Sequence, residues 1–324
     1  GPRPSTWSAP ARFSEAVAQM APDIVHVNGL GFAMPTWWLR QQLPAATALV
    51  IQDHASGVPL PSASAADQVK ELLRRRVMRA ADAFFFTAAD QAEPWRSMGL
   101  IGSDQTVHAI NEGSTSMTSV GTTEARRLTG IGGRPAILWV GRLNANKDPL
   151  CVLEAFARIR VTLPQATLTM IYRSDELLPE VRRRVDRDPR LRGGVRLLGA
   201  VPHDQMARYY SAADLFVLGS HQEGSGYALL EACACGALPA VTDIPAFRRL
   251  TRNGAIGRLW TPGDPHACAV ALVALARVIA PIVRANVRGH FERSLSWAAI
   301  ARDAHAAYAA VIASRRQRLA SEGA

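Results

Sequence analysis

Short apolar runs of four to seven residues alternate along the chain with amphipathic stretches of ten or more. Such runs are typical of buried strands, and the longer stretches are typical of helices. In the first half the pattern predicts strands over 24–28, 48–52, 83–87 and 106–110, and a helix over 66–79. In the second half it predicts strands over 137–140, 167–171, 195–198, 215–218, 238–241 and 255–259, and helices over 149–160, 177–185, 205–211, 227–235, 245–252 and 265–278.

This alternation predicts an α/β fold in which parallel sheets carry helices on both faces. A length of 324 residues suits two domains. A Gly-rich joint at 129–134 separates an Arg-bearing helix from a new strand. We therefore predict Rossmann-like domains over 1–130 and 131–285, followed by helices over 286–324. Such folds bind ligands at the carboxyl ends of their strands.

Charge is distributed unevenly along the chain. The net charge is +10, yet residues 1–130 carry 11 basic and 11 acidic residues, so the whole excess lies in 131–324. An anionic ligand, a nucleic acid or an anionic membrane would each fit. The Arg runs at 74–76 and 182–184 are interpreted as solvated helix faces, with contact to an anionic membrane surface as the alternative.

Neither membrane-spanning nor disulfide-rich architecture is predicted. The longest apolar candidate, 267–283, is interrupted by Arg277 and Pro281 and is shorter than the roughly 18 residues that a span needs. No signal peptide is visible at the start. The four cysteines are too few for a disulfide framework, and we predict that they are buried small hydrophobes in a protein of a reducing compartment.

The first segment with chemical content is VGRLNANKDP at 140–149. A predicted strand ends at Gly141, which allows close approach of a ligand to the backbone, and a helix begins at Pro149. Arg142 offers a fork of N–H donors to phosphate oxygens, and Lys147 offers a point charge. Because only two of the 37 basic residues are lysines, Lys147 carries extra weight. The alternative is an ordinary strand–loop–helix turn with two solvated cations.

The second segment, at 219–236, is a strand end followed by a Gly-rich loop and a helix. The N–H groups that open this helix, together with the helix dipole, form an anion site. They belong to Gly226, Tyr227 and Ala228. Glu223 in the loop and Glu231 in the helix are good acceptors for sugar or ribose hydroxyls. The alternative treats Glu223 as a dipole partner of the first turn and Glu231 as a surface residue.

The Glu-x7-Glu spacing followed by Ala-x-Ala-Cys-Gly resembles the retaining glycosyltransferases of family 4, whose GT-B fold has two facing Rossmann-like domains. The LLG-x-VPH and AADLFVL stretches within 197–218 match the same family. The resemblance is close over 134–265 and weaker over 20–130. The stretch from Phe291 to Trp297 resembles the closing helices of the family, which cross back onto the first domain.

The resemblance implies a role for each of these residues. Arg142 and Lys147, beside Gly141, would hold the diphosphate of a nucleotide-sugar donor, and Glu231 would accept from the ribose hydroxyls. Glu223 would contact the donor sugar, and His54 would lie beside the transferred sugar, so these two are the candidate catalytic residues. The remaining implied contacts are the N–H groups of Gly226, Tyr227 and Ala228 with the sugar or distal phosphate, and the backbone of Leu197 and Leu198 with the base.

Two cations and a helix N-terminus would stabilise a diphosphate leaving group without a metal, so we expect no metal and no other cofactor. The leaving phosphate of such retaining enzymes is thought to take the acceptor proton, which requires no protein nucleophile. The expected partners are a nucleotide-sugar donor and a carbohydrate, lipid or small-molecule acceptor, and no nucleic acid. The expected location is the cytoplasm, with peripheral contact to the inner face of the membrane as an option.

Four features depart from the family pattern. Only about 21 residues precede the PDIV segment at 22–25, without the family's Gly-rich loop, so we expect a first domain shortened at its N-terminus. Ser225 replaces a bulky apolar residue. The family's Asn-Gly-Val-Asp is Asn-Glu-Gly-Ser at 111–114, and its Gly-rich turn after the second strand of the second domain is Tyr-Arg-Ser at 172–174.

Three other functions fit parts of the sequence. A non-catalytic or incomplete GT-B protein would bind the nucleotide without transfer. A nucleotide-sugar 2-epimerase would need further carboxylates and histidines, and an Arg-rich nucleic-acid binder would need aromatic stacking platforms.

Asp186-Arg187-Asp188 resembles the Asp-x-Asp metal motif of the other glycosyltransferase fold, but it lies at a predicted helix end before Pro189. His26 and the pair Trp37-Trp38 are predicted in the core, with a cleft or acceptor-side position as the alternative.

Overall fold

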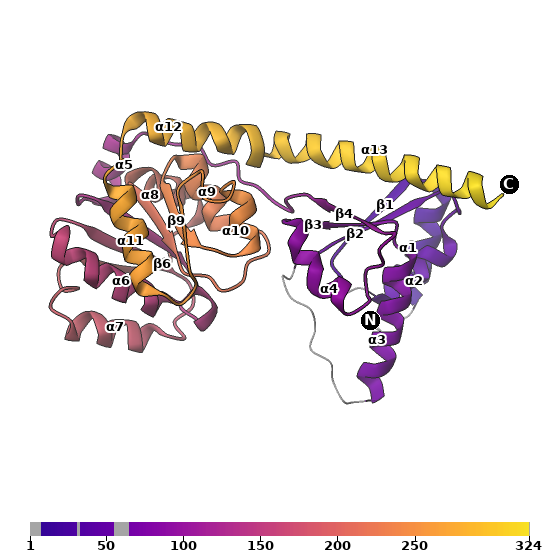
Figure 1. Cartoon of the computed structure of the whole chain (residues 1–324), viewed down its shortest axis with the longest axis horizontal. Coiled ribbons are helices and arrows are strands. Elements are labelled where there is room, and N and C mark those ends of the chain that lie inside the picture. Colours follow the sequence, from indigo (N-terminus) through magenta and orange to yellow (C-terminus); the bar gives the residue numbers. More distant parts are fainter. Residues whose placement is uncertain (1–7, 31–32, 55–64, 324) are drawn as a thin grey trace, which may run out of the picture. The chain divides into compact units, whose positions relative to one another are not determined.

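A computed structural model describes residues 8–30, 33–54 and 65–323. The chain forms two compact units, each built on its own parallel sheet (Figure 1). The first unit comprises residues 1–112 and 300–324, and the second comprises residues 113–299. Both sheets carry helices, which confirms the predicted α/β class with two Rossmann-like units.

The first unit contains a four-stranded sheet in the order β1-β2-β3-β4. Its strands are β1 (Ile24–Asn28), β2 (Ala48–Gln52), β3 (Ala83–Phe86) and β4 (Thr106–Ala109). Its helices are α1 (Ser8–Gln19), α2 (Ala33–Gln42), α3 (Ala65–Ala80), the 3-10 turn η1 (Ala89–Ala92), α4 (Glu93–Ser97) and most of α13 (Trp297–Glu322).

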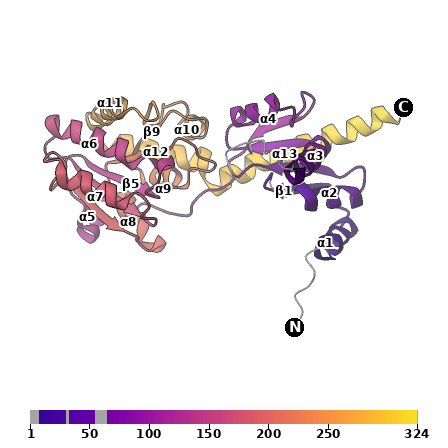
Figure 2. The same cartoon turned by 90° about the horizontal axis from the view of Figure 1, so that it is seen from below.

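Alternate residues of the central strands supply the two faces of this sheet. Leu49 and Phe84 belong to an apolar cluster with Met78 of α3. Their neighbours Val50 and Phe85 belong to a second cluster, which includes Ala304, Ala307, Tyr308 and Val311 of α13. Because side chains of a strand point alternately to opposite faces, the sheet is covered on both sides, and α13 covers one of them (Figure 2).

The second unit contains a six-stranded parallel sheet in the order β10-β9-β8-β5-β6-β7. Its strands are β5 (Ala136–Gly141), β6 (Thr167–Tyr172), β7 (Val195–Gly199), β8 (Leu215–Leu218), β9 (Leu238–Thr242) and β10 (Arg258–Trp260). Numbered from β5, the order is 3-2-1-4-5-6, which is that of a doubly wound nucleotide-binding sheet. The order reverses between β5 and β8.

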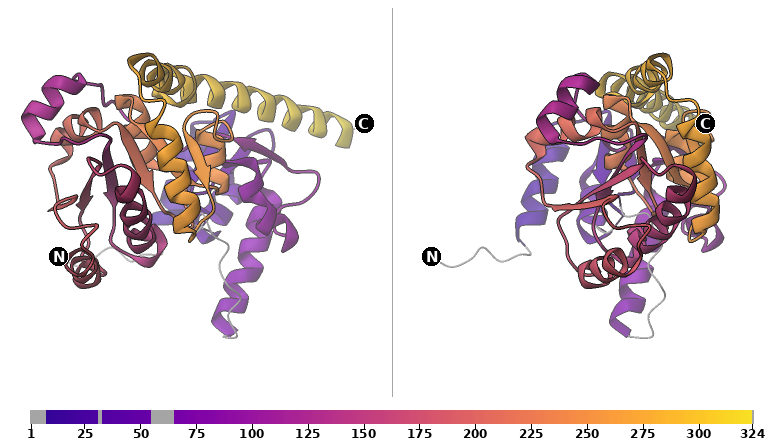
Figure 3. Two further views of the ribbon diagram at one scale, coloured as in Figure 1. Left: turned by 60° about the vertical axis from the view of Figure 1, so that its left-hand side comes forward. Right: turned by 90° about the vertical axis from the view of Figure 1, so that its left-hand side faces the viewer.

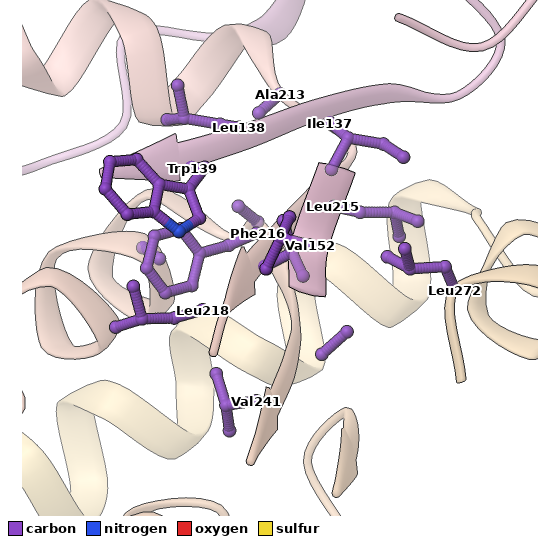
Figure 4. Packing of buried hydrophobic residues seen from close by; sticks show 14 of the residues in the cluster. Ile137, Leu138, Trp139, Val152, Ala213, Leu215, Phe216, Leu218, Val241 and Leu272 are labelled. Atoms are coloured by element: carbon purple, nitrogen blue, oxygen red, sulfur yellow. The ribbon is translucent and has the colours of Figure 1, made fainter. Parts of the chain in front are cut away.

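Helices cover both faces of this second sheet (Figure 3). One group in mutual contact contains α6 (Pro149–Thr162), α7 (Leu178–Arg187) and α11 (Pro265–Ala276). The other contains α5 (Thr122–Thr129), α8 (Met206–Ala212), α9 (Tyr227–Cys235) and α12 (Pro281–His290). The remaining elements are η2 (Ala145–Lys147), η3 (His203–Gln205), α10 (Pro245–Leu250) and the π-helical turn η4 (Phe291–Leu295). Between the groups lie Ile137, Trp139, Phe216 and Leu218, all at most 1% exposed (Figure 4).

The chain passes from the first unit to the second before α5, not at the predicted joint 129–134. Arg126 of α5 explains the difference, because its guanidinium binds the second unit. Its Nη2 lies 2.8 Å from Oδ2 of Asp214, and its Nε donates to the carbonyl of Ala212 at 3.1 Å. Of the predicted C-terminal segment 286–324, residues up to 299 also belong to the second unit.

The strand predicted over 255–259 is wrong in its first part. Arg252, Asn253 and Gly254 have φ angles of 52°, 54° and 80°, so a left-handed turn occupies this region and β10 begins only at Arg258. Each of the other predicted strands is confirmed to within one residue at either end. In the part of the chain that the structure describes, no single helix meets the length and hydropathy of a membrane span, whereas α11 taken with the helical stretch 281–322 meets them across a bend of 115°.

Candidate functional site

The two sequence segments with chemical content follow β5 and β8, the neighbouring strands at which the order of the second sheet reverses. Both strands are parallel, so their carboxyl ends lie at the same edge of the sheet. A doubly wound sheet binds its ligand at this position, outside the carboxyl ends of the strands. The topology therefore brings residues 140–149 and 219–231 to one place.

The first loop begins at Gly141, the last residue of β5. A Cβ atom there would lie 3.1 Å from the Trp139 ring, so a larger residue would crowd the core. Arg142 is exposed, and among the described residues it has no carboxylate partner. Asp148, with φ 41°, caps α6 by accepting from the N–H of Cys151 at 3.2 Å. The turn thus ends in a capped helix and leaves one cation open to a ligand.

Lys147 and Glu223 form an ion pair across the two loops. Their side chains are only 14% and 12% exposed, so this pair is less screened than a surface pair. Ser220 Oγ donates to Oε1 of Glu223 at 2.7 Å, and the carbonyl of Ser220 accepts from Thr242 Oγ1 at 2.5 Å. Two residues predicted separately therefore meet, and the Glu223 carboxylate is held at a fixed position.

Asn146 joins the same two loops through their backbones. Its Nδ2 donates to the carbonyl of Gln222 and its Oδ1 accepts from the N–H of Gln222, both at 3.0 Å. Its own carbonyl accepts from the N–H of His221 at 2.8 Å. The sequence analysis missed Asn146, because its partners lie about 76 residues away and no local pattern marks it.

The helix that follows the second loop, α9, begins after Gly226, whose φ is 64°. This positive φ favours glycine, and a Cβ atom would also lie 2.9 Å from Leu250 Cδ1, so the Leu250 side chain would have to shift. The N–H groups of Tyr227 and Ala228 in the first turn have no carbonyl four residues earlier within the helix. The start of a helix suits an anion in this way, and the contact of these groups with a phosphate stays a prediction.

Glu231 lies one turn further along α9. Its carboxylate accepts from Tyr210 Oη at 2.8 Å and lies 3.0 Å from Nε2 of His203. Burial raises the pKa of Tyr210 well above its usual value, and the Glu231 carboxylate raises it further, so the phenol keeps its proton and donates. Glu231 is mostly buried rather than a surface residue. Tyr210 and His203, its two partners, were not predicted.

Leu197 and Leu198 lie half-buried in β7, one of the two edge strands of the second sheet. The pairing of β6 with β7 changes register between Met170 and Ile171. Beyond the end of β6, Ser174 carries a buried Oγ without a hydrogen-bond partner within the described chain. A contact of this edge with a nucleotide base stays a prediction.

His54 lies two residues beyond the end of β2 and belongs to the first unit, whereas the other predicted site residues belong to the second. Its Nδ1 contacts Oε2 of Glu112, which follows β4. Burial raises the pKa of Glu112 to about 6, although the neighbouring His54 acts in the opposite direction. The sequence analysis recognised Glu112 only as a departure from the family pattern.

Asp186 and Asp188, the candidate metal motif, lie at the end of α7. Both oxygens of Asp188 bind the Arg190 guanidinium, at 2.9 and 2.6 Å, which lowers the pKa of this carboxyl to about 2. Among residues 8–30, 33–54 and 65–323, no three His, Cys, Asp or Glu side chains are grouped as metal ligands. All four cysteines are buried and free of disulfides.

Comparison with known sequences decides the family. Residues 134–277 match the family described as "Glycosyl transferases group 1", and residues 1–111 match the "Glycosyl transferase 4-like domain". The two matches together span most of the chain. The chain belongs to the glycosyltransferases. The resemblance to glycosyltransferases that the Glu-x7-Glu segment indicates is thereby confirmed.

Curated relatives match this glycosyltransferase over part of their length. The D-inositol 3-phosphate glycosyltransferase of Thermobispora bispora is 30% identical over 159 residues. That match covers 47% of this chain and 37% of the relative. The match thus spans well under half the length of this relative.

Solved structures show the same fold. Sucrose-phosphate synthase from Thermosynechococcus elongatus matches with a TM-score of 0.70 and 22% identity, over 97% of this chain and 81% of that one. HepE of Anabaena, solved with UDP and glucose, matches with a TM-score of 0.67 and 17% identity, over 99% and 83%. At these identities the likeness shows that the glycosyltransferase has the GT-B fold.

Proposed function

We propose that this glycosyltransferase transfers a sugar from a nucleotide-diphosphate donor to an acceptor hydroxyl, with retention of the anomeric configuration and without a metal ion. The observation that carries the proposal is the junction of β5 and β8. There Arg142, Lys147 and the start of α9 offer positive groups, and Glu223 and Glu231 offer carboxylates. A nucleotide sugar has the matching composition, a diphosphate flanked by two polyhydroxyl rings.

Each group has a distinct task in this proposal. The guanidinium of Arg142 donates two N–H groups to the diphosphate oxygens, because it has no carboxylate partner within the described chain. Lys147 and the first N–H groups of α9 bind the remaining phosphate oxygens. Glu231, held by Tyr210 and His203, accepts from the ribose hydroxyls, and Glu223 accepts from hydroxyls of the donor sugar.

Transfer exchanges one bond for another at the anomeric carbon. The bond from this carbon to the leaving phosphate oxygen breaks while the acceptor oxygen bonds to the same face. The acceptor proton passes to the leaving phosphate. The positive groups stabilise the charge that develops on the diphosphate, which is the role that electrostatic preorganisation plays in such reactions. His54 lies beside the transferred sugar in this proposal.

The proposed partners are the nucleotide sugar and a carbohydrate, lipid or small-molecule acceptor. Since HepE was solved with UDP and glucose, UDP is the first nucleotide to test. The surface proposed for peripheral contact with an anionic membrane comprises the Arg runs at 74–76 and 182–184. Arg183 and Arg184 pair with Glu180 and Glu154, which reduces the positive charge of that face.

Calorimetric titration of the chain with UDP, GDP and ADP, in the presence of a chelator, tests the donor site. We expect micromolar binding of one of the three. Arg142→Ala should weaken it about tenfold or more, because a charge-assisted fork is lost. Glu231→Gln should weaken it only by a few fold. Arg183→Ala is the control, since Arg183 pairs with Glu180 on the surface. Unchanged affinity in Arg142→Ala would refute the assignment of the diphosphate site.

Release of the nucleotide from the matching sugar donor separates transfer from binding alone. A transferase releases the nucleoside diphosphate as the sugar passes to an acceptor or, slowly, to water, and NMR of the glycosylated product shows the retained anomer. A protein that binds the donor but never releases the diphosphate would be the non-catalytic alternative. A requirement for divalent metal in this assay would contradict the metal-free mechanism.

A further inference from the structure

The Glu112 side chain is an unusual feature of the first unit, because it is only 3% exposed although it carries a carboxylate. Glu112 lies three residues beyond the end of β4. A buried carboxylate is costly unless a partner compensates its charge. The described residues that directly follow the four strands, 29–30, 53–54, 87–92 and 110–112, include no Lys or Arg. Among these described residues, the basic side chain is that of His54, and its Nδ1 contacts the Glu112 carboxyl group.

The contact involves one specific nitrogen of the imidazole. Nδ1 of His54 meets Oε2 of Glu112, while the His54 side chain as a whole is 39% exposed. A hydrogen bond to one ring nitrogen determines which nitrogen of a neutral histidine carries the proton. Above pH 6, where Glu112 is a carboxylate that only accepts, a hydrogen bond between the two groups requires the proton on Nδ1. Nε2 then presents a lone pair.

Three other titratable groups lie around this pair. His26 of β1 has its pKa lowered to about 4, by burial and then by the charge of His54. It therefore stays neutral, and its Nδ1 lies 2.6 Å from Oη of Tyr308 on α13. Asp53, which follows β2, raises the pKa of Glu112. Thus the environment offers His54 one anchoring carboxylate at Nδ1 and a neutral histidine nearby.

We propose that Glu112 is a positioning residue for His54, holding the imidazole by Nδ1 so that Nε2 accepts a hydrogen bond from a hydroxyl of the transferred sugar. The inference rests on the proposed function, in which His54 lies beside that sugar. The inference assigns a role to Glu112, which lies between Asn111 and Gly113 in the segment 111–114 that departs from the family pattern. A residue 58 positions from His54 in the sequence thereby becomes part of its site.

The tautomer of His54 tests the proposal in the wild-type chain. Two-bond nitrogen–proton NMR spectra of the ¹⁵N-histidine-labelled protein, assigned with His54→Gln, distinguish the two neutral forms. We expect the Nδ1–H form at about pH 8. The Nε2–H form would overturn the proposal. This measurement needs neither substrate nor any change to Glu112.

Kinetics of Glu112→Gln test the consequence for transfer. Glutamine keeps the size of the side chain but removes its charge, so the Nδ1–H form should lose its preference. We expect kcat to fall about tenfold or more, with the donor KM within about twofold, because the diphosphate contacts lie in the second unit. Asp90→Asn removes an exposed acid at the same edge of the first sheet and should leave kcat unchanged. A purely structural role of Glu112 would instead lower the amount of folded protein and leave kcat per folded molecule unchanged.

The outcomes separate the two proposals. If the nucleotide binds and sugar is transferred, but Glu112→Gln has wild-type kcat, the positioning role is refuted while the proposed function stands. If NMR shows the Nδ1–H form but no donor is ever turned over, the proposed function fails and the role in transfer fails with it. If Glu112→Gln does not fold, the tautomer in the wild-type chain still decides the geometry.

Discussion

Lys147 and Glu223 carry opposite charges within one small site, so a diphosphate that binds Lys147 competes with Glu223. Removing the carboxylate should free the cation and reduce repulsion of the phosphates. We therefore expect Glu223→Gln to bind the free nucleoside diphosphate a few fold more tightly than wild type, while transfer falls at least tenfold because a sugar contact is lost. Calorimetry and a transfer assay measure the two effects.

Ser220→Ala is the matched control for this variant. It removes one hydrogen bond to Glu223 but keeps the ion pair, so nucleotide affinity should stay close to wild type. Weaker nucleotide binding in Glu223→Gln would show that Glu223 positions Lys147 for the phosphates instead of competing with them.

His26 makes stability depend on pH. Its pKa in the folded chain is about 4, against an ordinary 6.5, because burial and then His54 disfavour the charged ring. The unfolded chain therefore takes up a proton between pH 6.5 and 4 that the folded chain does not. Above pH 6.5 this proton uptake does not reduce the free energy of unfolding. As pH falls from 6.5 to 4, the free energy of unfolding decreases by at most about 1.4 kcal/mol per pH unit.

Urea unfolding at pH 7 and at pH 4.5 measures this effect. Wild type should lose more stability than His26→Gln between the two values, because glutamine does not titrate. Glu112 acts in the opposite direction, since its raised pKa makes folding less favourable as pH rises from 4.5 to 6. The comparison between variant and wild type cancels that contribution. Equal losses in the two proteins would contradict the role of His26.

Individual site residues could be predicted from sequence where a local pattern marks them. Lys147, Glu223 and Gly226 lie in Gly-rich turns between a strand and a helix, and the structure places them together. Asn146 and Glu112 were not predicted as site residues, since each acquires its meaning from a partner far along the chain. Such pairs depend on the folded topology, and spacing alone does not reveal them.

At the scale of elements, α13 is attached to the first sheet by a charged anchor as well as by apolar packing. Asp82, which precedes β3, has a side chain that is 3% exposed and binds Arg315 and Arg318 of α13. It also accepts from the N–H of Leu49 at 2.8 Å. One carboxylate therefore joins the sheet to its covering helix.

Asp82→Ala should destabilise the first unit by about 3 kcal/mol, because a buried N–H and two guanidinium groups lose their acceptor. Chemical denaturation followed by circular dichroism measures the loss. Asp23→Ala is the control, since Asp23 pairs with Arg316 at the surface and such pairs contribute about 0–1 kcal/mol. Similar losses in the two variants would mean that α13 is held by apolar contacts alone.

Strands were the elements most readily predicted. Those in the middle of a parallel sheet are apolar on both faces, so they stand out as short continuous runs, as in β2 and β8. β10 lies at the edge and is only three residues long, so its pattern was confused with the turn before it. The assignment of α5 to a unit depended on Arg126, whose partner no local pattern indicates.

At the scale of the whole molecule, charge follows the division into units. The first unit carries 13 basic and 12 acidic residues, and the second carries 24 and 15. The net charge of the second unit is thus +9, and this unit contains the proposed diphosphate site. A field of this sign favours an anionic donor beyond its direct contacts.

Nucleotide binding should consequently weaken with salt. Raising NaCl from about 50 mM to about 500 mM shortens the screening length from roughly 14 Å to roughly 4 Å. We expect the Kd for the nucleoside diphosphate to rise several fold, and that for the uncharged nucleoside, where measurable, to change little. Titrations at the two salt concentrations provide the test. Salt-independent binding of the diphosphate would show that only desolvated contacts matter.

The division between the units also sets the order in which this protein can be completed as it is synthesised. Residues 113–299 form a continuous piece, so the second unit has all its parts once that stretch has left the ribosome. The sheet of the first unit is made earlier, but the helix that covers one of its faces comes from residues 300–324. Val50 and Phe85 therefore stay uncovered by α13 until residues 300–324 have been made, and the unit whose sheet is made first is the last to close.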